Sequence, residues 1–274
     1  MRAWAIGSAV FSAAFQVGAQ PQPASPPPQV WKLDWVRNQC AISTGDVATA
    51  GLIFLMTPGD PDPEVDIVGS PKIVPAAHHI ADPNRSTFIV TLGPGGQTYQ
   101  PLAYEVYEDG KPRVVELHRL YRPFAIAFAG SDELRVQALD KSVAIPIVGA
   151  SKAMAAVKQC TDERLANWGV DVKAYNALRV PAADLKDRNW ISYSDYPADA
   201  IQREFSGQVI ARLDVDSTGK VTGCTVVVPS GMPSVDSITC KRALDRGRLE
   251  PAIGADGRPT ASQRIENIEF KLFS

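Results

Sequence analysis

The chain has 274 residues, of which 45% are hydrophobic and 21% are charged, and this length and composition predict one or two globular domains. The formal net charge is -2, which argues against a nucleic-acid partner, because a phosphate backbone requires a concentrated face of Lys and Arg. The 20 glycines and 22 prolines favour strands joined by turns over long helices.

Residues 1–19 have the pattern of a secretory signal peptide. Arg2 gives a positive start, an apolar run extends from Ala3 to Phe15, and small residues precede a cleavage site that we predict after Ala19. The alternative is an uncleaved anchor in the inner membrane that faces the periplasm, although the apolar run is shorter than the about 20 residues that span a bilayer. We expect export to the periplasm, and contact with the membrane only if this segment is not cleaved.

Residues 20–30 are rich in proline and form a predicted extended tether, and a β-rich domain of unknown function is predicted at residues 31–172. Short apolar runs recur there between turn residues, which indicates a sandwich or barrel. A helix is predicted from Ser151, its N-cap, to about Cys160, and a second helix includes residues 162–168. The expected strands of this domain include residues 52–56, 88–92, 113–117, 124–128 and 134–139.

The pattern changes between residues 171 and 187, and a second domain of α+β class is predicted at residues 187–274. Residues 208–215 alternate as in a strand, and a turn at residues 216–220 leads into a return strand, so this stretch predicts a hairpin. The other expected elements are a helix from Ala198 to about Phe205, a helix capped by Ser234 that runs to about Arg246, and a last strand at residues 262–272.

The chain contains four cysteines, an even number that fits an oxidising compartment. None of them lies in a CxxC pair, so zinc binding and thioredoxin-type chemistry are poorly supported. Of the three pairings, we expect Cys40–Cys160 and Cys224–Cys240, because each disulfide then closes within one predicted domain. The alternative is four buried free thiols.

A series of short motifs runs through the second domain. They are Tyr196-Pro197, Gly207-Gln208-Val209, Val215–Val221, Ser230-Gly231, Asp236, Arg248–Ala252 and Gly257–Pro259. In this order they resemble the C-terminal domain of TonB-family proteins, and the resemblance implies the element order helix–hairpin–helix–strand. Leu249 stands where the family usually has Phe, and Val235 where it has Leu, and both substitutions keep an apolar residue.

The resemblance implies a periplasmic binding protein that is not an enzyme and uses no cofactor. In the family, a peptide of an outer-membrane transporter adds as a strand to an exposed sheet edge, where backbone hydrogen bonds supply the affinity. The last strand supplies this edge here, and the Tyr-Pro motif lies near the entry of the site. The partner-binding residues that the resemblance implies are Tyr196, Pro197, Arg264, Ile265, Glu266, Asn267, Ile268, Glu269 and Phe270.

Two roles remain open for this domain. The first is docking of a segment of a transporter or of another envelope protein, with energy-coupled transport across the outer membrane as a further implication of the family. The energy transducers of the family keep an uncleaved N-terminal membrane-spanning segment and a long Pro-rich segment that crosses the periplasm. This chain instead has a short predicted tether followed by another predicted domain. The second role is that of an envelope structural protein, in which the domain only packs or forms a homodimer and Arg264, Glu266 and Glu269 protect the strand edge.

Catalytic and metal-binding motifs are incomplete in the sequence. Residues 217–220 fit Ser-x-x-Lys, but they occupy a predicted turn and the partner motifs of that chemistry are absent. His78 and His79 would point to opposite faces of a strand, and with His118 they have no metal-ligand spacing. We therefore expect no catalytic residue and no metal site.

Overall fold

The computed structural model describes residues 29–46, 50–60, 62–68, 88–93, 95–108, 111–138, 141–185 and 190–271. The predicted signal peptide, most of the predicted tether and the pair His78-His79 lie outside the described residues. Within the described part of the chain, no helix has both the length and the apolar character needed to cross a membrane.

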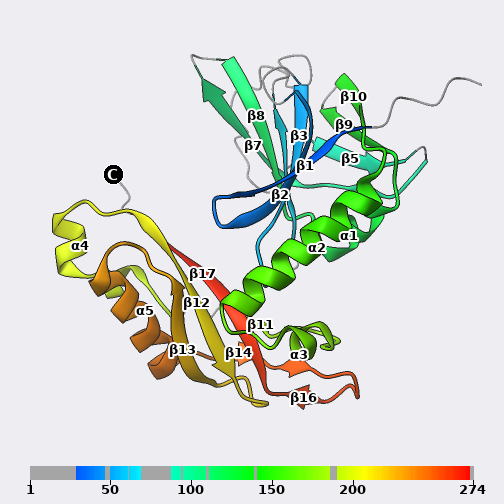
Figure 1. The fold of residues 1–274 in the computed structure, drawn as a ribbon. Helices are drawn as coiled ribbons and strands as arrows, with labels where there is room; N and C mark the ends of the chain where they lie inside the picture. The colour runs from blue at the N-terminus through cyan, green and yellow to red at the C-terminus, as the bar shows by residue number, and fades with distance from the viewer. Residues whose placement is uncertain are drawn as a thin grey trace, which may run out of the picture.

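Two antiparallel sheets form the N-terminal region, which confirms that this region is β-rich (Figure 1). The larger sheet has the strand order β1-β2-β3-β4-β8-β7, and the smaller one has the order β10-β9-β5-β6. Alternate side chains of both sheets enter one buried core, to which β3 contributes Phe54, β8 contributes Leu117 and β9 contributes Val136. The strands are β1 Trp31–Val36, β2 Gln39–Asp46, β3 Ala50–Met56, β4 Glu64–Val68, β5 Phe88–Leu92, β6 Thr98–Tyr99, β7 Leu102–Glu108, β8 Lys111–His118, β9 Glu133–Ala138 and β10 Lys141–Pro146.

Helix α1, Tyr121–Ala129, occupies the place of the strand predicted at residues 124–128, so that prediction is wrong. Phe124 and Phe128 are four residues apart, which puts both rings on one helical face, and both side chains are fully buried. The ring of Phe128 packs against that of Phe54 with 4.8 Å between the centroids. A short apolar run of this kind is compatible with the two-residue period of a strand and with the 3.6-residue period of a helix. The burial of one helical face stabilises the helix here.

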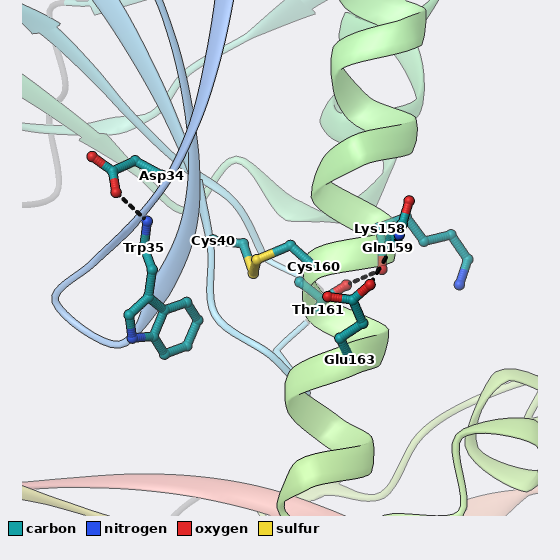
Figure 2. Close-up of a disulfide and its surroundings, with 8 residues drawn as sticks. All are labelled: Asp34, Trp35, Cys40, Lys158, Gln159, Cys160, Thr161 and Glu163. Atoms are coloured by element: carbon teal, nitrogen blue, oxygen red, sulfur yellow. Dashed lines mark hydrogen bonds between the residues drawn. A yellow bond between two sulfur atoms is a disulfide. The ribbon is translucent and has the colours of Figure 1, made fainter.

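Helix α2, Ala150–Asn167, is one continuous helix where the sequence predicts two. Its N-cap is Gly149 and not Ser151, because glycine readily adopts the left-handed conformation that precedes the first turn, with φ 81°. Cys160 on this helix forms the predicted disulfide with Cys40 on β2, as Figure 2 shows. The bond ties α2 to the larger sheet across 120 residues of sequence.

A three-stranded antiparallel sheet with the order β13-β12-β17 lies at the centre of the C-terminal region (Figure 1). The predicted hairpin is confirmed, because Asp216 accepts hydrogen bonds from the backbone N–H groups of Thr218 and Lys220 in the turn between β12 and β13. The short strands β14, β15 and β16 precede β17 and have no counterpart in the predicted element order. The strands are β11 Ala183–Asp184, β12 Gly207–Val215, β13 Val221–Val228, β14 Leu249–Glu250, β15 Ala252–Ile253, β16 Pro259–Thr260 and β17 Ser262–Phe270.

Helix α5, Pro233–Arg246, packs on one face of this sheet with Val235 and Ala243 buried. The predicted cap Ser234 is wrong, because the N-cap is Met232 and the proline that follows it occupies the first helical turn. Proline suits that position, since its fixed φ is helical and its missing N–H has no helical partner there.

A second disulfide joins Cys240 on α5 to Cys224 on β13, so both predicted pairings are confirmed. Helix α4, Ala198–Gln202, is shorter than the helix predicted to end near Phe205. A 3-10 turn at Tyr193–Asp195 precedes α4.

The opposite face of the sheet packs against the end of α2 and against α3, Val172–Asn176. Ile210 on β12 and Ile265 on β17 are buried there together with Leu165 and Val170. Since both faces of the sheet are covered, a chain that extends the sheet has access only at an edge strand.

Candidate functional site

β17 is an edge strand of the C-terminal sheet. It pairs with β12 along its whole length, from Gly207 opposite Phe270 to Val215 opposite Ser262. Among the described residues, no strand pairs with its other side. In an antiparallel pair, alternate residues direct their N–H and C=O groups away from the neighbour, so β17 presents backbone donors and acceptors at the sheet edge. β13 forms the edge on the opposite side of the sheet.

The predicted binding residues Tyr196, Ile268 and Phe270 have side chains in the core. Ile268 is 8% exposed and Phe270 5%, and the ring of Tyr196 meets that of Phe270 edge-on with 5.3 Å between centroids. The hydroxyl of Tyr196 donates to the backbone carbonyl of Phe205, and burial raises its pKa above the ordinary value. Pro197 is half-buried as the N-cap of α4. These side chains hold β17 in place and do not face a partner.

Asp195 anchors the segment before Tyr196 to α5, and it is absent from the predicted site. Its buried carboxylate accepts hydrogen bonds from Arg242 Nε at 2.6 Å, from Arg246 Nη1 at 3.0 Å, and from the N–H and hydroxyl of Ser192. Burial alone would raise the pKa of Asp195, but the hydrogen bonds from Ser192 and the charge of Arg242 lower it below its ordinary value. The spacing of Ser192 and Asp195 forms a capping box, which is the one sequence signal that could have found this residue.

Side chains in the first half of β17, residues 262–266, contact other parts of the chain. Arg264 donates to the backbone carbonyl of Ala182 at 2.8 Å and to Asp184 at 2.9 Å, and it pairs with Glu266 at 2.7 Å. Burial alone would lower the pKa of Arg264, but the charges of Glu266 and Asp184 raise it. Ile265 is buried against the end of α2. The predicted binding residues of this half therefore have partners within the chain.

The second half of β17, residues 267–270, is more accessible. Asn267 and Glu269 are exposed, and Glu269 pairs with Lys271 at 2.8 Å while both side chains remain more than half exposed. In the part of the chain that the structure describes, no backbone group bonds to the outer side of this stretch. Of the predicted edge, this stretch is therefore the part that a second chain can reach.

A family model described as the C-terminal domain of the Gram-negative bacterial TonB protein matches residues 192–272. No curated protein matches the chain. The matched stretch begins at Ser192, the N-cap of the 3-10 turn before Tyr196, and it includes the sheet β13-β12-β17 and helix α5. Proteins of this family face the periplasm and interact with outer-membrane proteins, and the family is not one of enzymes. Residues 192–272 are therefore a C-terminal domain of the TonB family.

Proposed function

We propose that the TonB C-terminal domain binds an extended segment of an outer-membrane protein, such as a transporter, by adding it as a strand beside β17. The observation that carries this proposal is the outer side of residues 267–270, where the outward-facing backbone groups have no partner among the described residues. In this mode of recognition, backbone pairing supplies affinity and alternate side-chain positions supply specificity.

The buried side chains of β17 support this role because they fix the strand before a partner arrives. Ile268 and Phe270 pack in the core with Tyr196, and Asp195 ties the preceding segment to α5. A strand held in this way loses little conformational freedom on binding, so the ordering cost falls mainly on the incoming peptide.

The length of the open stretch sets how a peptide can pair with it. Residues 267–270 span about 13 Å at about 3.3 Å per residue, which is short for a strand. Pairing over a longer stretch requires that Arg264, in the first half of β17, gives up its hydrogen bonds to Asp184 and to the Ala182 carbonyl. Asp184 is half exposed but Arg264 is only 20% exposed, so this pair contributes more than the about 0–1 kcal/mol of a surface ion pair, and the backbone hydrogen bonds of a peptide must outweigh it. In this proposal the segment around Asp184 holds the Arg264 side chain until a longer peptide displaces it.

A structural role is the second candidate, and the buried contact with α2 favours it. Ile210 and Ile265 pack against Leu165 and Val170 on the face of the sheet and not on its edge. Docking on β17 and packing against the N-terminal region are therefore compatible. If packing is the sole role, added peptides leave the β17 amides unchanged.

The test uses the ¹⁵N-labelled chain purified from the periplasm and synthetic peptides that match N-terminal segments of outer-membrane transporters from the same organism. We expect amide shifts that grow with peptide concentration and lie on β17 and its neighbour β12. The other edge strand, β13, is the internal control. Absence of shifts at millimolar peptide, or shifts centred on β13, contradicts the proposal.

Two N-methylated forms of a binding peptide separate backbone pairing from other contacts. In one form the methyl groups replace the N–H hydrogens of even positions, and in the other those of odd positions. Since only alternate N–H groups of an added strand face its neighbour, we expect one form to lose binding and the other to keep it. Equal affinity of the two forms contradicts strand addition.

A further inference from the structure

Three side chains able to bind a metal lie together on the outer face of the larger N-terminal sheet. The register of β4 and β8 pairs Val65 with Leu117, which are both core residues, so Glu64, Glu116 and His118 face the other side. His118 Nε2 lies 3.9 Å from a carboxylate oxygen of Glu64 and 3.6 Å from one of Glu116. The three candidate ligand atoms all lie within 4.8 Å of one another.

These separations are close to those of a zinc site. Two ligands at about 2.0–2.1 Å from a tetrahedral zinc ion lie roughly 3.3 Å apart, so small side-chain rotations bring the three groups to bonding distance. One imidazole and two carboxylates are a mixed nitrogen and oxygen set, which suits zinc and similar divalent cations better than magnesium or calcium. A water molecule completes the fourth position, as it does where a protein supplies three ligands.

A buried carboxylate beside this cluster gives an independent reason to expect a cation. Asp66 lies opposite Glu116 on the same face and is 1% exposed. Its Oδ2 accepts a hydrogen bond from Arg37 at 3.2 Å, but its Oδ1 is buried without a partner among the described residues. The Arg37 side chain also approaches Glu116 to 3.7 Å and is 62% exposed. One exposed arginine thus pairs with two carboxylates, and a buried carboxylate oxygen without a hydrogen bond is costly.

We propose that Glu64, Glu116 and His118 bind a divalent cation of the zinc type, with the buried Asp66 beside it on the same face of the sheet. The cation ties β4 to β8 across the sheet surface. The ring of Tyr104 packs edge-on against that of His118 with 5.3 Å between centroids, which restricts the imidazole. Sequence spacing gives no sign of this site, because only the pairing of β4 with β8 brings Glu64 to His118.

The first experiment measures Zn²⁺ binding by calorimetry, with the untagged chain stripped of metal by a chelator. We expect one Zn²⁺ per chain, and at least tenfold weaker binding in each of the variants His118→Ala and Glu64→Gln. The matched control is the double variant His78→Ala/His79→Ala, which removes the other two histidines and should keep its affinity within twofold. No binding, unchanged binding in His118→Ala, or loss of binding in the control overturns the proposal.

The second experiment needs no substitution and therefore does not depend on the folding of a variant. Histidine labelled with ¹⁵N reports directly on the ring nitrogens, and we expect Zn²⁺ to shift one nitrogen of His118. A shift confined to the other histidines, or equal binding of Ca²⁺ and Zn²⁺ with no change at His118, shows that the imidazole is not a ligand and overturns the proposal.

Discussion

Removing the two disulfides one at a time should destabilise different parts of the chain by different amounts. The Cys224–Cys240 bond links residues 16 apart, whereas the Cys40–Cys160 bond links residues 120 apart. In the chain-entropy model, loops of these lengths correspond to about 3 kcal/mol and about 5 kcal/mol of stabilisation. Both values are large against the roughly 5–15 kcal/mol by which a domain is stable.

Each effect should stay within one region, because each bond belongs to one core. Cys40 is fully buried in the core of the N-terminal region, and Cys224 packs against the core of the C-terminal region. In each variant both cysteines of the pair are replaced by alanine, because serine would bury a hydroxyl group at the position of Cys40. Hydrogen exchange followed by mass spectrometry over a urea series gives a free energy of unfolding for β2 and for β12 separately.

We expect the variant without Cys224 and Cys240 to lower the free energy measured at β12 by about 3 kcal/mol and to leave β2 unchanged. The variant without Cys40 and Cys160 should lower the value at β2 by about 5 kcal/mol. An equal loss at both strands in either variant, or a larger loss from the shorter loop, refutes the reasoning.

Three further substitutions test the contacts around the site. Asp195→Asn should lower the free energy of unfolding of the C-terminal region by about 2 kcal/mol at neutral pH, because Arg242 loses a charged hydrogen bond. The pKa of Asp195 is below its ordinary value, so its contribution is present above the unfolded-state pKa and is lost as the pH falls through the folded-state pKa. Urea titrations should therefore show variant and wild type converging in acid, and a constant difference would contradict this. Ile265→Ala should cost about 2–4 kcal/mol and speed amide exchange at the end of α2, where its side chain is buried, and an unchanged urea midpoint would show that the contact carries no energy. Gly59→Ala should lower the melting temperature, because φ is 87° and the added Cβ would lie 2.7 Å from that of Ile265. Gly95→Ala has a similar φ and open space around it, so it should cost less, and the reverse order would refute the steric argument.

Features that depend on local rules or on simple pairing are predictable from the sequence. The hairpin of β12 and β13 follows from its alternating residues and from the turn that Asp216 closes. Both disulfides follow from the requirement that each pair closes within one region. The last strand is found within two residues of its observed end at Phe270.

Features that depend on distant contacts are not predictable in this way. The run from Phe124 to Phe128 fits a strand or a helix, and only packing against Phe54 decides between them. Arg264 contacts Asp184, which is 80 residues away in the sequence. No local pattern therefore predicts that the Arg264 side chain is already paired within the chain. For this reason the sequence predicts a longer binding edge than the stretch that the structure leaves accessible.

The exchange rates of single β17 amides, with and without a bound transporter peptide, test the central claim most directly. Added pairing should slow the outward-facing amides of residues 267–270 and leave the amides already paired with β12 unchanged. Unchanged rates across these residues at saturating peptide, or slowing confined to β13, would mean that the edge of β17 does not accept a strand.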